Sequence, residues 1–90
     1  MNENSAKVNM CSSPDPQSVC NCVYEVANVL QVPSSDENKY YFASKTYATG
    51  ADTLVTVVVE SEYLQVTVNC EKMVIGNMLI KDLKSALGAL

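Results

Sequence analysis

Two alternating segments, residues 53–60 and 63–70, carry the strongest pattern of apolar and polar positions in the chain. Both are rich in β-branched residues, and the short connection between them predicts an antiparallel hairpin. If Glu60 pairs with Tyr63, the apolar positions of both strands fall on one face, because successive strand residues point to opposite faces. The core residues that this register predicts are Val55, Val57, Val59, Leu64, Val66 and Val68.

The segment between Val19 and Leu30, which precedes the hairpin, has apolar residues spaced as in a helix. Apolar residues recur there at intervals of three and four positions, which predicts a helix with one buried face. The apolar stripe consists of Val19, Cys22, Val23, Val26 and Leu30. Asp15 can accept the first helical N–H bonds, Pro16 suits the first helical position, and Pro33 disfavours helix at the residue before it. We therefore expect the helix to begin at Pro16 and to end near Gln31.

Two weaker strands are expected outside the hairpin. Residues 5–10 alternate loosely between apolar and polar side chains, so residues 1–14 are expected to be either a first edge strand or loose. Aromatic residues gather in residues 40–47, which predicts a strand that ends at the turn 48–50.

The end of the chain predicts a strand followed by a helix. Residues 71–75 extend the apolar pattern into a short strand, and Asn77 can cap a helix that ends at Gly88. The complete order is strand, helix, four strands, helix. This order predicts one α+β domain over residues 1–90, an antiparallel sheet with helices packed on one face. A domain of 90 residues is marginal alone, so we expect it to be part of a longer chain.

Composition excludes several kinds of partner. The 90 residues have a net charge of −4 and contain Lys but no Arg, so no basic stripe is present to bind phosphates. Nucleic acid is therefore not an expected partner, and contact with an anionic membrane surface should be indirect. The sequence predicts neither a signal peptide nor a spanning segment, which favours a cytosolic location.

Groups that would support catalysis are sparse. The chain has no His, and its three Gly are isolated, so neither an acid–base centre nor a phosphate-binding loop is predicted. Cys20 and Cys22 flank one residue of the predicted helix, where their side chains diverge, so we interpret the cysteines as free thiols. The four cysteines are Cys11, Cys20, Cys22 and Cys70. We expect no enzyme, no cofactor and no metal site.

Exposed aromatic and aliphatic residues are the remaining functional candidates. Tyr24 on the predicted helix and Tyr63 on the outer face of the hairpin are the tyrosines expected to be exposed. Leu54 and Val58 make that outer face more apolar than solvent favours. The predicted protein-binding surface therefore includes Tyr24, Tyr63, Leu54 and Val58.

Several sequence segments resemble segments of one known protein family. "VTVNCEKMVIGNMLIKDLKSAL" (66–87) resembles the end of the beta subunit of adaptor protein complex three. "YFASKTYATGADTLVTV" (41–57), "VANVLQVPSS" (26–35) and the initial "MNENSA" resemble other segments of the same beta-adaptin ear.

The resemblance implies the platform of an adaptin ear, with a fold similar to the TATA-binding protein. It also implies a non-catalytic domain that recruits accessory or regulatory proteins through short peptide motifs. The rest of the chain would bind the other adaptor subunits. The implied location is the cytosolic face of Golgi, endosomal and coated-vesicle membranes, in transport to lysosomes and related organelles.

Two alternatives stay open at this point. One is a free-standing cytosolic scaffold of the same fold. The other is a thiol-dependent protein that uses Cys20 and Cys22, which requires a depressed cysteine pKa.

Overall fold

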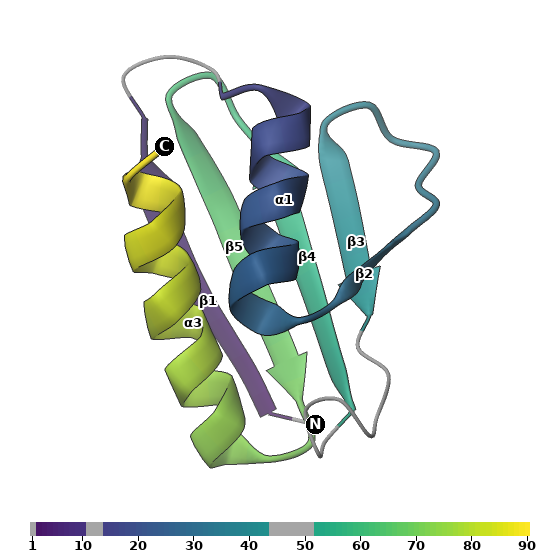
Figure 1. Cartoon of the computed structure of the whole chain (residues 1–90), viewed down its shortest axis with the longest axis vertical. Helices are drawn as coiled ribbons and strands as arrows, with labels where there is room; N and C mark the ends of the chain where they lie inside the picture. The colour runs from purple at the N-terminus through teal and green to yellow at the C-terminus, as the bar shows by residue number, and fades with distance from the viewer. Residues whose placement is uncertain (1, 11–13, 44–51) are drawn as a thin grey trace.

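The computed structural model describes residues 2–10, 14–43 and 52–90. Within these ranges a five-stranded antiparallel sheet is covered on one face by two helices (Figure 1). The sheet has the strand order β1-β5-β4-β3-β2. The elements are β1 (Asn2–Asn9), α1 (Pro16–Ala27), β2 (Leu30–Val32), β3 (Lys39–Ala43), β4 (Thr53–Val59), β5 (Tyr63–Cys70) and α3 (Met73–Gly88). This arrangement confirms the predicted α+β class and the helical cover on one face.

The central hairpin of β4 and β5 has the predicted register. Glu60 donates its backbone N–H to the carbonyl of Tyr63 at 2.9 Å. Beyond this pair, Val59 lies opposite Leu64 and the following pairs continue in step. Of the predicted core residues only Val59 is half-buried, and the other five have no exposed surface. The alternating pattern therefore correctly predicted both the strand pairing and the buried face of this hairpin.

The first helix begins as predicted. Pro16 is its first residue, and the Asp15 carboxylate accepts hydrogen bonds from the backbone N–H and the hydroxyl of Ser18, both at 3.3 Å. The cap satisfies an N–H group that has no partner within the helix, and proline at the first position sacrifices no helical hydrogen bond.

The predicted end of this helix is wrong. The helix stops at Ala27 rather than near Gln31, because Asn28 adopts the left-handed conformation (φ 54°, ψ 44°) and donates its N–H to the carbonyl of Tyr24. The chain then continues as the edge strand β2. Leu30, which the sequence places on the buried helical stripe, is consequently exposed on that strand.

The strand predicted over residues 71–75 is also wrong. The last helix, α3, begins at Met73, so Gly76 and Asn77 lie inside it. A Cβ atom at Gly76 would lie 3.1 Å from the side-chain nitrogen of Asn4 and 3.3 Å from the Cβ of Cys70. Gly76 therefore allows the first turns of α3 to approach the sheet closely, rather than forming a turn. The predicted order of strand, helix, four strands and helix still holds, because the unpredicted strand β2 replaces the strand expected at residues 71–75.

The two remaining strands match their predictions in part. The first strand spans Asn2–Asn9 and lies at the edge of the sheet, beside β5. The aromatic strand β3 is described as far as Ala43, and the rest of the predicted segment lies outside the described residues.

A single apolar layer lies between the sheet and the helices. Both helices and four of the strands contribute fully or almost fully buried side chains to it, including Val8, Val19, Val23, Phe42, Val57, Val66, Leu83 and Leu87. Removing a branched aliphatic side chain of this kind from water contributes about 1.5 to 3 kcal/mol. Neither of the two described helices covers the opposite face of the sheet.

Candidate protein-binding surface

The four residues predicted to bind other proteins lie in two separate places. Tyr24 is exposed on α1, in the helical layer. Leu54 and Val58 on β4 and Tyr63 on β5 alternate with buried residues, so they lie on the uncovered face of the sheet. The structure therefore brings three of the predicted residues to one face, whereas Tyr24 lies in the helical layer on the other side of the sheet.

The β2–β4 half of the uncovered face carries exposed apolar side chains next to Lys39, Tyr41 and Thr56. The register pairs Leu30 with Ala43 and Ala43 with Leu54, so these three side chains form one row across the strands. Val32 lies on the same face in the next row. Leu30, Val32 and Leu54 each keep between 37% and 48% of their surface exposed, which marks this half as a candidate contact surface. We call Leu30, Val32, Leu54 and the half-buried Val58 the open-face patch.

The β1–β5 half of the same face is polar. The Lys7 ammonium lies 4.2 Å from the centre of the Tyr63 ring, a cation–π geometry that leaves Tyr63 half-buried. Further along, the hydroxyls of Ser5 and Thr67 share a hydrogen bond of 3.2 Å. The ring of Tyr63 is thus already in contact with Lys7 of the same domain. Tyr63 lies beside the open-face patch rather than at its centre.

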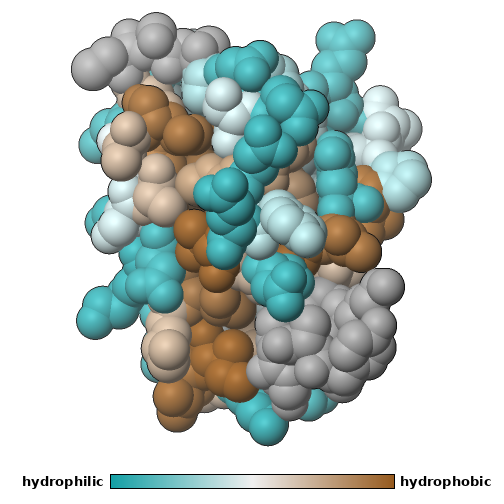
Figure 2. All heavy atoms as spheres, viewed as in Figure 1, coloured by the Kyte–Doolittle hydropathy of each residue, from teal (hydrophilic) through white to brown (hydrophobic). Residues whose placement is uncertain are grey.

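A second group of exposed apolar residues lies at the start of α3. Met73, Val74 and Met78 are all exposed there. Figure 2 shows hydrophobic side chains gathered at the end of the molecule where α3 begins. The sequence does not predict this group, because the pattern of residues 71–75 favours a strand.

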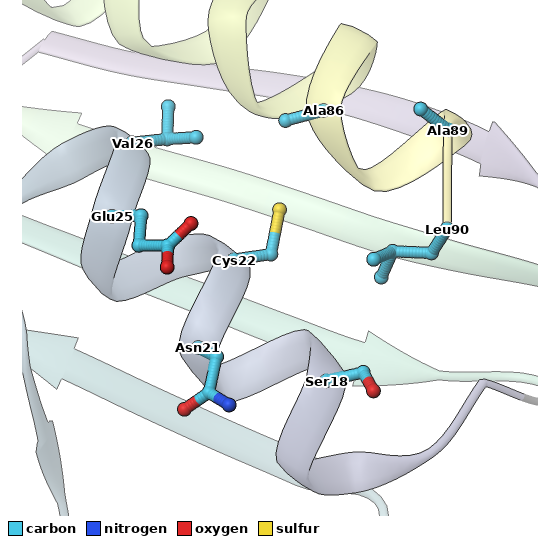
Figure 3. A pocket seen from close by; sticks show the side chains of 8 residues that line it. All are labelled: Ser18, Asn21, Cys22, Glu25, Val26, Ala86, Ala89 and Leu90. Atoms are coloured by element: carbon cyan, nitrogen blue, oxygen red, sulfur yellow. The ribbon is translucent and has the colours of Figure 1, made fainter.

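A groove separates the two helices near the end of α3 (Figure 3). Its volume is about 420 Å³, and it opens widely to solvent. The lining residues are Ser18, Asn21, Cys22, Glu25 and Val26 of α1 together with Ala86, Ala89 and Leu90 from the end of the chain. Most of these side chains are small, and the groove depends on how α1 packs beside α3, which no local pattern predicts. Tyr24 is not one of its lining residues.

Cys20 and Cys22 do not have the character of reactive thiols. Burial raises the pKa of Cys20 and of Cys22, and the neighbouring Glu25 carboxylate raises the pKa of Cys22 further. Both groups are therefore protonated at neutral pH, whereas thiol chemistry requires the thiolate. Cys70 is buried and accepts a hydrogen bond from the Thr53 hydroxyl at 3.4 Å. The thiol-dependent alternative is not supported. Cys11 lies outside the described residues.

Two further properties concern only the described ranges. In them, no three His, Cys, Asp or Glu side chains are grouped so that they could hold a metal ion. No helix there is both long and apolar enough to cross a membrane.

Fold and surface together define a two-layer α+β domain whose exposed apolar surfaces are its main candidates for function. The family model of the AP-3 complex subunit beta-1 C-terminal domain matches residues 1–87. The chain therefore belongs to this beta-adaptin family, as the resemblance of its strings implied.

Individual relatives agree with this assignment. The chain is 40% identical to AP-3 complex subunit beta-1 of Mus musculus and 41% identical to that of Homo sapiens, each over 91 residues. Each match covers 97% of this chain and 8% of the relative. It is also 42% identical over 66 residues to AP-3 complex subunit beta-2 of Mus musculus, a match that covers 72% of this chain and 6% of that protein. No solved structure gives a significant match.

Proposed function

We propose that this domain is a non-catalytic protein-interaction module of a vesicle-coat adaptor beta subunit. It recruits accessory or regulatory proteins by binding short peptide segments. It works at the cytosolic face of Golgi, endosomal and coated-vesicle membranes, in transport toward lysosomes and related organelles. The rest of the beta subunit associates with the other adaptor subunits. Family membership supports the adaptor role, and the open-face patch is the observation that carries the binding role.

The open-face patch has the features of a weak peptide site. Its aliphatic side chains project from β2 and β4, the two strands that flank β3, so their spacing is set by the sheet rather than by flexible loops. A few such anchors supply most of the binding energy in protein interfaces. Burial of apolar area contributes about 25 cal/mol per Å² before ordering costs, so a small patch favours weak binding. Weak sites repeated over a coat give avidity without any single tight bond.

The test compares capture of cytosolic proteins by the full-length subunit and by two variants. Leu54→Ser removes an exposed anchor of the open-face patch, and Tyr24→Ala removes an exposed side chain from the other layer. We expect Leu54→Ser to lower capture of specific partners about fivefold or more, equivalent to about 1 kcal/mol, with little change in thermal midpoint. Tyr24→Ala should leave capture unchanged. The reverse pattern would move the binding surface to the helical layer.

The free-standing scaffold remains the competing function. It predicts that the natural protein has the mass of this chain alone. An adaptor subunit has many times that mass, since this chain covers only 8% of the length of the adaptor relatives. An immunoblot of the endogenous protein separates these possibilities, since a band near 9.8 kDa favours the scaffold.

A further inference from the structure

The first strand, β1, has a row of backbone groups that no other part of the described chain pairs with. The N–H of Met10, just past the strand, donates to the carbonyl of Glu62 at 2.8 Å, so the backbone of Met10 faces β5. Backbone direction alternates along an antiparallel strand, so even-numbered residues of β1 bond to β5 and odd-numbered ones face outward. The outward residues are Glu3, Ser5, Lys7 and Asn9, and their side chains are exposed. Each of them offers one N–H donor and one carbonyl acceptor at an open sheet edge.

This edge lacks the short length, proline, bulge and outward lysine with which natural proteins commonly keep strand edges from pairing. β1 is eight residues long, contains no proline, and follows β5 in unbroken register from Asn2 to Asn9. Its lysine, Lys7, lies over the Tyr63 ring of β5 and therefore points into the domain. The opposite edge of the sheet differs, because β2 has three residues and is followed directly by Pro33. Only the β1 edge is therefore prepared to accept a further strand.

The charges on the β1 edge match those of a second copy turned by 180°. If two copies of β1 pair antiparallel around Ser5, each Glu3 lies opposite the Lys7 of the other copy. All these residues face outward, so each pair can exchange two backbone hydrogen bonds. Opposite charges that face each other across strands stabilise a sheet, whereas like charges destabilise it. We propose that β1 pairs with β1 of a second copy of this chain, which joins the two sheets into one.

The helix beside this edge fits the same symmetry. α3 packs over both β1 and β5 (Figure 1). A Cβ atom at Gly88 would lie 3.8 Å from the side chain of Val8, so this side of α3 faces β1. Edge pairing would place the two copies of α3 about two strand spacings apart, roughly 9 to 10 Å, which is an ordinary distance between packed helices. The half-buried Ile80, two turns before Gly88 on this side, would add apolar contact between them.

A second copy suits this edge better than an unrelated extended peptide. A peptide could bond to the free backbone groups, but a folded copy also brings a helix beside α3 and supplies both opposite charges. One strand and one side of a helix form an interface at the low end of the size range. We therefore expect a dissociation constant on the order of 10 to 100 μM.

This pairing leaves the open-face patch uncovered, because the patch lies on β2 and β4, toward the opposite edge of the sheet. Since the outward residues of β1 have their side chains on the open face, both copies would turn that face to the same side. A dimer would thus present two open-face patches on one continuous surface, although the pairing itself does not depend on what the patches bind.

Exchange of charges tests the pairing directly. Self-association of the full-length protein is measured by analytical ultracentrifugation between about 1 and 200 μM, a range that brackets the expected dissociation constant. Glu3→Lys places lysine opposite lysine, and Lys7→Glu places glutamate opposite glutamate, so each variant alone should dimerise about tenfold more weakly. An equimolar mixture of the two variants restores opposite charges at both positions. It should form a mixed dimer with about the affinity of the unaltered protein.

Two further variants separate edge pairing from other association. Ser5→Pro removes an outward N–H and the exposed hydrogen bond with Thr67, but no backbone bond to β5, so it should abolish dimerisation in a folded protein. Lys39→Glu makes the same change of charge as Lys7→Glu on β3, away from the edge, and should leave the dissociation constant unchanged. Thermal midpoints check that each variant is folded.

Three results would overturn the proposal. The first is an unaltered protein that stays monomeric at about 200 μM. The second is dimerisation that folded Ser5→Pro and Glu3→Lys leave intact, or a mixture of the charge variants that forms no mixed dimer. The third is a monomeric protein whose capture of cytosolic proteins is lost in Ser5→Pro, which would assign the edge to an extended segment of another protein.

Discussion

Val57→Asp is the most severe single test of the hairpin register. Val57 has no exposed surface and lies in β4, the middle strand of the five. Its partners are Val66 on β5 and Tyr40 on β3, so a carboxylate introduced there would face the apolar layer beneath the helices. No buried basic group of the described core is present to pair with it, since Thr53 is the only polar residue among the buried ones there.

The magnitude follows from desolvation. Burial raises the pKa of a carboxyl group by up to 3 to 5 units, and each unit corresponds to about 1.36 kcal/mol of preference for the neutral form. At neutral pH the carboxyl group can take up a proton, so this ionisation cost is limited to about 4 kcal/mol. Leaving the buried polar group without a partner adds about 1 to 3 kcal/mol, and loss of the valine adds about 1 kcal/mol or more. Domains of this size have a total stability of about 5 to 13 kcal/mol. Val57→Asp should remove most or all of it.

Val58→Asp is the matched control. Val58 is the next residue of the same strand, but it points to the uncovered face and pairs with Lys39 on β3. A carboxylate there keeps contact with water and gains a cationic neighbour, so we expect a change of about 1 kcal/mol or less. Urea unfolding followed by circular dichroism measures both variants. Equal urea midpoints for Val57→Asp and the unaltered protein would refute the register, as would a larger loss for Val58→Asp.

Two further predictions concern α1. Asp15→Ala should lower the free energy of unfolding by about 1 kcal/mol, because the N–H of Ser18 loses its cap, whereas Asp15→Asn should retain most of the stability; urea midpoints compare them. At pH 8 the raised pKa of Cys20 and of Cys22 keeps the thiolate fraction below that of a free cysteine, so iodoacetamide should label both slowly in native protein and rapidly in urea, as mass spectrometry would show. Faster labelling of the native form than of the unfolded form would restore the thiol hypothesis.

The features that are predictable from the sequence depend on short-range physics. The hairpin register follows from alternation, since a slip of one residue would expose every apolar side chain of the strand. The start of α1 follows from the Asp15-Pro16 pair, in which the first residue caps the helix and the second fits its first turn. Both signals are complete within a few residues, and both are confirmed.

The features that are not predictable depend on contacts between distant segments. The spacing of Leu30 suits the helical stripe as well as an edge strand, and the left-handed Asn28 decides between them. The local pattern favours Gly76 as part of a turn, but this glycine is needed where α3 approaches Asn4 of β1. Tyr63 is half-buried because β1 pairs with β5 and brings Lys7 over its ring. None of these outcomes is visible in a local pattern.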